Sequence, residues 1–218
     1  MKIALFGASG MIGQGVLREC LLDADVEEVL RVVRRPLGRR EAKLRDIVVA
    51  DLDEVTAYEQ EFKGFHACFF CLGVSASGMS EENYRKITYD LTIAVAESWS
   101  RLNPQTVFIY VSGAGTDSTE RGRWMWARVK GATENALLRM PLKAYMFRIG
   151  AVQPLHGIES GTRLYRVVYS LGGPLVTLLR KAFPKLITTT EIVGRGMLRV
   201  AKHGAPKRVL ENADINQL

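Results

Sequence analysis

Residues 3–13 read IALFGASGMIG, a run of four apolar residues followed by glycines at every third position. A short, continuously apolar run is typical of a strand buried on both faces of a parallel sheet. Gly7 permits a tight turn, Gly10 lets backbone N–H groups approach a phosphate, and Gly13 lets the next helix pack closely on the strand. A helix that begins here would present free N–H donors and partial positive charge. The stretch therefore predicts a strand–turn–helix unit that binds a diphosphate.

Outward from this unit, strand-like and helix-like segments alternate along the first 150 residues. Further strands are expected at Val29–Val33, Ile47–Ala50, Ala67–Leu72, Val107–Val111 and Ala144–Ile149. Helices are expected at Met11–Leu22, Val55–Phe62, Glu81–Arg101 and Arg123–Arg139. This alternation predicts an α/β fold with right-handed βαβ units and a Rossmann-like, doubly wound parallel sheet that has helices on both faces.

The chain is expected to form a single domain over residues 1–218. Residues 1–152 are the expected cofactor-binding core, 153–188 a small substrate or lid segment, and 189–218 a C-terminal helix and tail. Within the second part, Leu164–Leu186 interleaves leucines with basic residues. We interpret it as a lid over the substrate; a surface that touches a membrane or a partner is the alternative. The tail from Val209 gives no prediction.

Composition excludes several classes of protein. The 218 residues are 47% hydrophobic and 24% charged, an ordinary globular balance that excludes general disorder. Three cysteines do not make a disulfide scaffold. The longest uncharged run, Gly64–Ser80, is too short and polar to span a bilayer, and the first residues do not resemble a signal peptide. A cytoplasmic protein without stable membrane insertion is expected, as a monomer or a homodimer.

The net charge of +7 is concentrated in one block. Between Arg31 and Arg45 there are seven basic residues and one acidic residue, Glu41. A protein that binds nucleic acid over its whole surface would spread its excess charge more widely. The block also lacks interleaved aromatic residues that could stack on bases. The block therefore indicates that this part of the chain binds one anionic group. Binding to nucleic acid is the least favoured of three interpretations.

The glycine spacing G-x-x-G-x-x-G, with Ser9 inside it, resembles the short-chain dehydrogenase/reductase superfamily, particularly its extended and atypical members. In that superfamily the end of the second strand selects the cofactor, by an acid for NAD or an arginine for the 2′-phosphate of NADP. Here that strand ends in Arg34 and Arg35. The paired donors of a guanidinium suit a phosphate. The resemblance thus implies NADP(H), with Arg39, Arg40 and Arg45 left in solvent.

The resemblance also implies the rest of a cofactor site. Asp51 and Leu52 match the pair beside the adenine, and the Cys71–Gly73 segment matches the loop beneath the ribose on the nicotinamide side. The expected cofactor-binding set is Gly7, Ser9, Gly10, Met11, Ile12, Gly13, Arg34, Arg35, Asp51, Leu52, Cys71, Leu72, Gly73 and Lys130. With Ser112-Gly113-Ala114, Lys130-Gly131 and residues 147–150, the pattern is closest to the atypical group related to the human Tat-interacting protein and to bacterial sugar-nucleotide-epimerase-like proteins.

The expected catalytic residues depart from the superfamily at one position. Ser112 and Lys130 match its serine and lysine, but Trp126 stands where its tyrosine would act as general acid or base. Indole donates a hydrogen bond and does not titrate in water. Tyr84, Tyr89, Asp117 and His156 are the possible substitutes, and the sequence does not choose among them.

Two functions follow from this departure. The first is an NADP(H)-dependent enzyme that reduces, oxidises or epimerises a small carbonyl or hydroxyl compound. The alternative is a catalytically impaired protein that senses NADPH and regulates a partner.

Cys68 and Cys71 resemble a redox or metal pair, but residues three apart in a strand point to opposite faces. We therefore expect no metal site.

Overall fold

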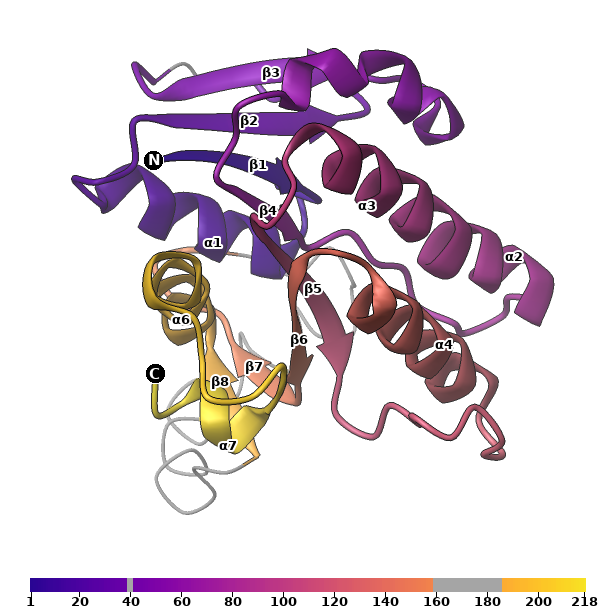
Figure 1. Ribbon diagram of the computed structural model, residues 1–218. Coiled ribbons are helices and arrows are strands. Elements are labelled where there is room, and N and C mark those ends of the chain that lie inside the picture. Colours follow the sequence, from indigo (N-terminus) through magenta and orange to yellow (C-terminus); the bar gives the residue numbers. More distant parts are fainter. Residues whose placement is uncertain (39–40, 159–185) are drawn as a thin grey trace.

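The main sheet contains seven parallel strands in the order β3-β2-β1-β4-β5-β6-β9. It is seen in a computed structural model that describes residues 1–38, 41–158 and 186–218 (Figure 1). The strands are β1 (Lys2–Phe6), β2 (Glu28–Val33), β3 (Leu44–Val48), β4 (Ala67–Phe70), β5 (Val107–Gly113), β6 (Lys143–Ile149) and β9 (Val209–Glu211). The expected α/β fold with a doubly wound parallel sheet is confirmed.

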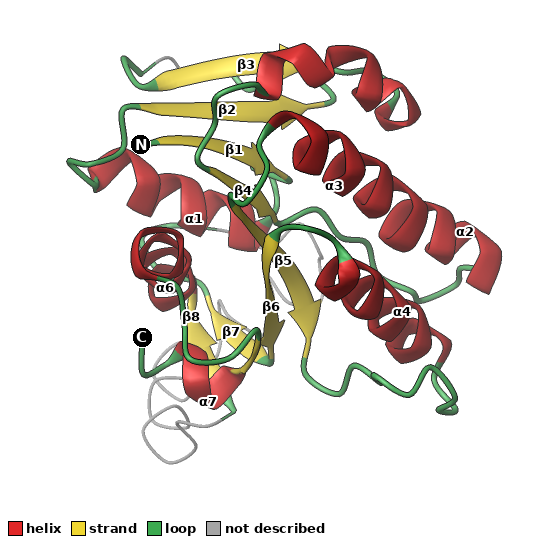
Figure 2. Ribbon diagram, viewed as in Figure 1, coloured by secondary structure: helices red, strands yellow, loops and turns green. Residues whose placement is uncertain are grey.

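Helices cover both faces of this sheet (Figure 2). They are α1 (Met11–Leu22), the 3₁₀ helix η1 (Leu52–Phe62), α2 (Glu81–Arg85), the π-helical turn η2 (Lys86–Asp90), α3 (Leu91–Leu102), α4 (Met125–Arg139), α6 (Thr190–His203) and α7 (Asn212–Ile215). Helices α1 and α6 pack on one face, and η1, α3 and α4 pack on the other. A small second sheet pairs β7 (Ala151–Gln153) with β8 (Ile187–Thr189).

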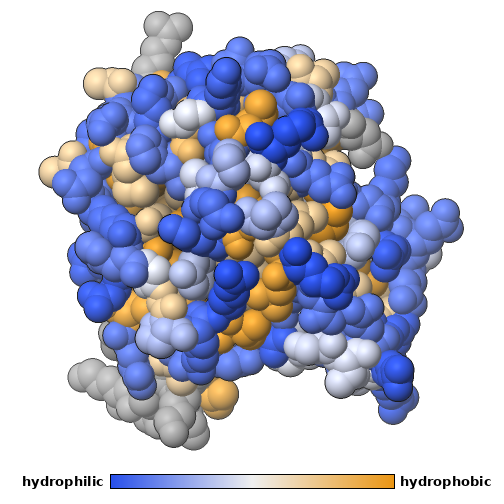
Figure 3. All heavy atoms as spheres, in the orientation of Figure 1, coloured by the Kyte–Doolittle hydropathy of each residue, from blue (hydrophilic) through white to orange (hydrophobic). Residues whose placement is uncertain are grey.

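The central strands are buried on both faces, as their apolar sequences predict. On β1, Ile3 and Leu5 join the core under α1 and α6, whereas Ala4 and Phe6 join the core under η1 and α3. Because successive side chains of a strand point to opposite faces, such a strand must be apolar throughout. The outer surface in the same orientation is largely hydrophilic, with apolar side chains showing only in small patches (Figure 3).

The strand order reverses between β1 and β4. Helix α1 leaves β1 toward one face, and the next strand on the other side of β1 is β4. In open α/β sheets, ligands bind outside the carboxyl ends of the strands at such a reversal. The fold therefore places the expected site beyond the ends of β1, β2 and β4.

The structure corrects two expectations about elements and adds two elements that were not expected. The third strand is Leu44–Val48, not residues 47–50, because an edge strand tolerates the exposed charges of Arg45 and Asp46. The helix expected at residues 81–101 contains the π-helical turn η2. The tail, which gave no prediction, supplies β9 and α7, and β9 pairs with β6.

The basic block is also less uniform than its sequence indicates. Arg31 is buried on β2 and forms a bidentate ion pair with Asp46 on β3, at 2.7 and 2.8 Å. Arg45 was expected in solvent; it is exposed but paired with Glu28 and Glu61. Residues 39–40 and most of the expected lid segment, including its amphipathic part, lie outside the described residues.

Candidate functional site

The glycine loop between β1 and α1 is shaped by two contacts that exclude side chains. Gly7 has a φ of +77°, and a Cβ atom there would be 2.6 Å from the backbone nitrogen of Leu72. A Cβ atom on Gly13 would be 2.1 Å from the carbonyl oxygen of Gly7. A Cβ atom on Gly10 would meet no atom closer than 3.4 Å. Gly7 and Gly13 are therefore required by packing, whereas Gly10 leaves free space above the loop.

The N-terminus of α1 faces this free space. Gly10 is the N-cap residue, no side chain caps the helix, and the first turn contains no acidic residue. The first N–H groups of a helix have no partner within the helix. Together with the helix dipole, they form a site suited to an anion such as a diphosphate.

A cavity of about 560 Å³ lies beyond the ends of β1, β2 and β4, within the size range of sites for small organic ligands. Most of the residues expected to bind the cofactor line it: Gly7, Ser9, Gly10, Arg34, Asp51, Leu52, Cys71, Leu72 and Gly73. Met11, Ile12, Gly13, Arg35 and Lys130 are not among its lining residues.

The opposite wall of the cavity was not expected from the sequence. It is formed by Met79, Asn83, Lys86, Ile87 and Leu91. Lys86 and Ile87 belong to the π-helical turn, and such turns are frequent at functional sites. The helical pattern of residues 81–101 gives no sign of the turn, so sequence reasoning could not place these side chains in the cavity.

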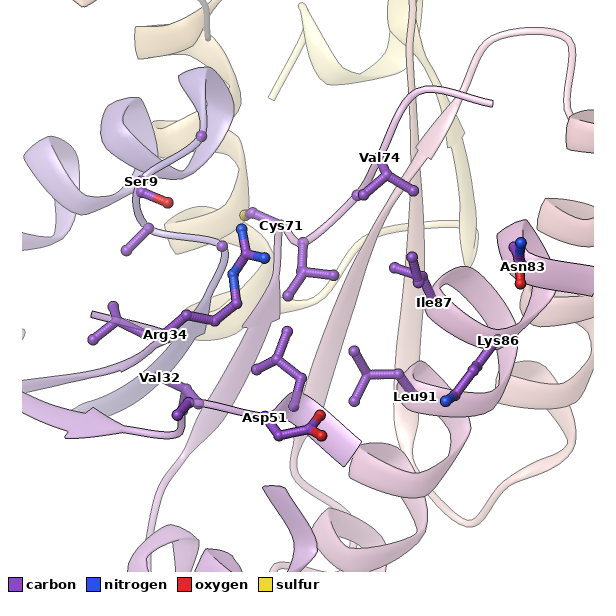
Figure 4. Close-up of a pocket in the computed structure, with 18 of the residues that line it drawn as sticks. Ser9, Val32, Arg34, Asp51, Cys71, Val74, Asn83, Lys86, Ile87 and Leu91 are labelled. Atoms are coloured by element: carbon purple, nitrogen blue, oxygen red, sulfur yellow. The ribbon is translucent and has the colours of Figure 1, made fainter. Parts of the chain in front are cut away.

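Arg34 and Arg35 differ in position. Both are exposed, but Arg34 lines the cavity and Arg35 does not. Figure 4 shows the Arg34 side chain extending from the end of β2 toward Ser9 and Cys71, with Asn83, Lys86, Ile87 and Leu91 on the opposite side. The described geometry thus offers one guanidinium beside the glycine loop and the free N-terminus of α1. These groups line the cavity with positive charge and free N–H donors.

Ser112 lies at the end of β5, where it is buried beside a second hydroxyl. Its Oγ atom is 2.9 Å from Oγ1 of Thr116, which donates a hydrogen bond of 2.8 Å to the carbonyl oxygen of Gly113. Each hydroxyl has one proton and two lone pairs. Because Thr116 gives its proton to Gly113, Ser112 donates its own proton to Thr116, and the Ser112 oxygen keeps lone pairs that can accept a hydrogen bond from a ligand.

Trp126 covers the loop that follows Ser112. Cβ atoms placed on Gly113 and Gly115 would each be 3.6 Å from its indole ring. Helix α4 comes this close because Gly131 has no side chain; a Cβ atom there would be 1.8 Å from the carbonyl oxygen of Asp117. The Lys130-Gly131 sequence thus sets the distance between α4 and the loop.

Lys130 approaches this loop from α4, with its Cδ atom 4.0 Å from a Cβ atom placed on Gly113. Its Nζ atom donates to the Tyr110 hydroxyl and to the Val111 carbonyl oxygen, each at 3.3 Å. Burial lowers the pKa of Lys130 to about 8, against the weaker opposite effect of Glu134. Burial also raises the pKa of Tyr110 well above its ordinary range. A neutral phenol and a carbonyl oxygen therefore surround an amine that titrates near neutral pH.

The four expected substitutes for the missing tyrosine are placed as follows. Tyr84 is buried on α2, and Tyr89 is covered by the Arg85 guanidinium at 4.1 Å. The Asp117 carboxylate accepts hydrogen bonds from Thr119, Arg121 and Gly122, which lower its pKa. His156 Nε2 forms a hydrogen bond of 2.5 Å with the Glu191 carboxylate at the start of α6. None of the four lines the cavity.

Cys68 and Cys71 face opposite sides of the sheet, as the strand geometry predicts. Cys68 belongs to the core under α3, and Cys71 packs against the core under α1. Burial raises the pKa of both thiols. Both are free thiols, and their placement gives no support to a redox pair.

Comparison with known proteins identifies a family for this chain. Residues 3–120 match the model of the NAD-dependent epimerase/dehydratase family. Protein FMP52, mitochondrial, from Debaryomyces hansenii is 24% identical over 206 residues, or 93% of this chain and 87% of that protein. The leucinostatins biosynthesis cluster protein T of Purpureocillium lilacinum is 25% identical over 123 residues, which are 55% of this chain and only 45% of that protein.

Solved structures share the fold. MoeE5 in complex with UDP-glucose and NAD has a TM-score of 0.68 at 18% identity, covering 96% of this chain and 75% of MoeE5. A putative NAD-dependent epimerase/dehydratase from Bacillus halodurans has the same TM-score and identity, and the similarity covers both chains completely.

Among the helices that the structure describes, none has the length and apolarity needed to cross a membrane.

Proposed function

This chain belongs to the NAD-dependent epimerase/dehydratase family, and from that membership we propose that it binds NADP(H) and reduces, oxidises or epimerises a small carbonyl or hydroxyl compound. The glycine loop and the free N-terminus of α1 would hold the diphosphate of the cofactor. Ser112 and Lys130 would lie at the reacting end, where the bound cofactor supplies or accepts a hydride. The substrate would meet this end beside Ser112, whose hydroxyl oxygen can accept a hydrogen bond from a substrate hydroxyl.

We attribute the proposed preference for NADP(H) over NAD(H) to Arg34. Its guanidinium lines the cavity at the end of β2, the position where the choice between a 2′-hydroxyl and a 2′-phosphate is made. No acidic residue occupies the end of β2, where the sequence runs Val32-Val33-Arg34-Arg35. A guanidinium forms stronger, charge-assisted hydrogen bonds with a phosphate than with a hydroxyl. The adenine would lie beside Asp51 and Leu52.

Calorimetric titration with NADP⁺ and NAD⁺ tests this proposal. We expect Arg34→Glu to weaken NADP⁺ binding by about 100-fold or more, since a charge-assisted contact is replaced by repulsion. NAD⁺ binding should change much less. Arg35→Glu is the matched control, because it makes the same charge change outside the cavity. If neither variant changes the preference between the two dinucleotides, NADP(H) selection by this strand end is wrong.

A protein that senses NADPH is the second candidate, and Trp126 favours it. The indole lies over the Gly113–Gly115 loop where a general acid would be needed. This function predicts a stable NADPH complex that is not consumed in the presence of a panel of carbonyl compounds. Steady oxidation of NADPH by any member of the panel would exclude it.

Assembly and location remain part of the proposal. We propose a monomer or homodimer in the cytoplasm, although one relative is named as mitochondrial. Size-exclusion chromatography with light scattering distinguishes the two assemblies, and microscopy of a tagged chain in its native cell tests the location.

A further inference from the structure

Reduction of a carbonyl at the end of β5 requires a group that supplies a proton, and Trp126 cannot do so. Of the four substitutes, Asp117 has its pKa lowered by the hydrogen bonds that its carboxylate accepts, and Tyr84 is buried on α2. Tyr89 and His156 are engaged by Arg85 and Glu191. The remaining candidate is Lys130, one helical turn after Trp126 on the same face of α4.

The contacts of Lys130 leave its ammonium able to exchange a proton. An ammonium has three N–H donors, and the Tyr110 hydroxyl and the Val111 carbonyl oxygen account for two of them. Both acceptors are neutral, so neither fixes the positive charge. The side chain passes Gly113, where a Cβ atom would be 4.0 Å from Cδ of Lys130. The stem of Lys130 therefore runs beside the loop that begins with Ser112, and its amine contacts β5.

Among the described residues, Glu134 is the charged group that raises the pKa of Lys130. It is fully buried one turn along α4. An unpaired carboxylate one helical turn away would favour the charged form of Lys130. However, Arg148 on β6 contacts both carboxylate oxygens of Glu134, with Nε at 3.1 Å from each and a second nitrogen at 2.6 Å from Oε2. Tyr110 on β5, and Tyr84 on α2 behind it, complete the titratable surroundings.

We propose that Lys130 itself exchanges the proton with the substrate oxygen, and that Arg148 is a positioning residue that neutralises Glu134 and so leaves Lys130 able to lose that proton. This inference rests on the proposed oxidoreductase function. In reduction, the carbonyl carbon gains a hydride from the reduced dinucleotide, which is thereby oxidised. The carbonyl oxygen takes a proton from the Lys130 ammonium, and the resulting neutral amine regains a proton from water.

The ionisation of Lys130 can be measured without a substrate. Competitive labelling with acetic anhydride between pH 6 and 11, read by mass spectrometry, gives the titration midpoint of each lysine, and Lys143, exposed on β6, serves as the reference. We expect a Lys130 midpoint near 8. Arg148→Met should raise it by roughly one pH unit or more, since Glu134 loses its partner. Glu134→Gln should lower it, and this variant decides the matter if Arg148→Met does not fold. A midpoint equal to that of Lys143, or one that neither variant moves, would overturn the inference.

Turnover separates proton exchange from simple positioning. With NADPH and phenanthrenequinone as the carbonyl compound, the wild-type rate should fall as the pH rises through about 8, where Lys130 loses its proton. Lys130→Arg keeps the charge and the donors but cannot release a proton at these pH values. At saturating NADPH we expect it to lose about 100-fold in rate, as general acid catalysis is worth at least this much.

The outcomes for the inference and for the proposed function are distinct. Retention of the wild-type rate by Lys130→Arg would overturn the inference alone. Tight NADPH binding by the wild type without any reduction of phenanthrenequinone would overturn the inference and favour the NADPH-sensing function. Failure of the wild type to bind NADPH at all would remove the proposed function, and the inference with it.

Discussion

The Nζ atom of Lys130 lies 3.3 Å from the hydroxyl oxygen of Tyr110, beneath the end of β5. The phenol is buried and stays neutral, because burial raises its pKa. The ammonium therefore gains a hydrogen-bond acceptor without gaining a counter-charge. Removing a charged amine from water costs free energy that one neutral contact does not offset. The fold thus retains a lysine that destabilises it at neutral pH.

Lys130→Met is accordingly expected to stabilise the fold at pH 7. The pKa of Lys130 is about 8 in the folded chain against an ordinary 10.5, so between these values the unfolded chain binds more protons and wild-type stability rises with pH. Below pH 8 the lysine is charged in both states and the cost is complete. Allowing for its partial exposure, we expect a gain of about 2 kcal/mol.

Urea unfolding at pH 7 and pH 10.5 measures this effect. The advantage of Lys130→Met should shrink at the higher pH, where the wild-type lysine is largely neutral in the folded chain. Lys143→Met, which changes an exposed lysine on β6, is the control and should show no such pH dependence. An equal advantage at both pH values would mean that packing, and not the charge, is responsible.

Gly10→Ala and Gly13→Ala are expected to separate cofactor binding from folding. The added methyl group has room at Gly10, but at Gly13 it would meet the Gly7 carbonyl oxygen at 2.1 Å. Gly13→Ala should therefore lose about 2 kcal/mol or more of stability through overpacking. Gly10→Ala should unfold like the wild type yet bind NADP⁺ at least tenfold more weakly, because its methyl group occupies the space above the loop. Thermal unfolding and calorimetry check both effects; unchanged NADP⁺ affinity in Gly10→Ala would contradict a phosphate at this position.

Spacing alone predicted the parts of the molecule in which local geometry decides the structure. The three glycines specified the turn, and the apolar strands specified a sheet covered on both faces. The strand period also placed Cys68 and Cys71 on opposite faces. These features depend on residues close together in the sequence, so a pattern is sufficient to read them.

Features that depend on distant packing could not be read in this way. The π-helical turn interrupts a regular helical pattern, yet it brings Lys86 and Ile87 into the cavity wall. Arginine is usually a surface residue, so the sequence gives no sign that Arg31 is buried. The register of β2 with β3 brings Asp46 beside it. Strand β9 is three residues long and is specified by its pairing with β6.

Asp46→Ala is expected to destabilise the chain far more than Arg45→Ala, although both break ion pairs made by the basic block. Arg31 is 2% exposed and loses its bidentate partner when Asp46 is removed, which should cost about 3 kcal/mol. Arg45 is 43% exposed, and an exposed pair contributes less than about 1 kcal/mol. Urea unfolding measures the difference, and NADP⁺ affinity should be unchanged in both variants. Equal losses of stability would show that the buried pair has no special role.

Trp126→Tyr is expected to add a phenol as a second proton donor beside Lys130. The new hydroxyl would lie one helical turn before Lys130, whose positive charge lowers the pKa of a neighbouring phenol. With NADPH and phenanthrenequinone at pH 7, the rate should rise about tenfold or more. Trp126→Phe is the control, because it also replaces the indole by a smaller ring but adds no hydroxyl, and it should give no increase.

The same substitution also tests the role of Lys130. With a tyrosine at position 126, the lysine needs only to be positive, so Trp126→Tyr combined with Lys130→Arg should be active, whereas Lys130→Arg alone should not. This difference arises because an arginine can lower the pKa of the phenol but cannot itself release a proton. If Trp126→Tyr binds NADPH tightly and still leaves the rate unchanged, the loop around Ser112 does not hold a carbonyl in a reactive position, and the NADPH-sensing function is favoured instead.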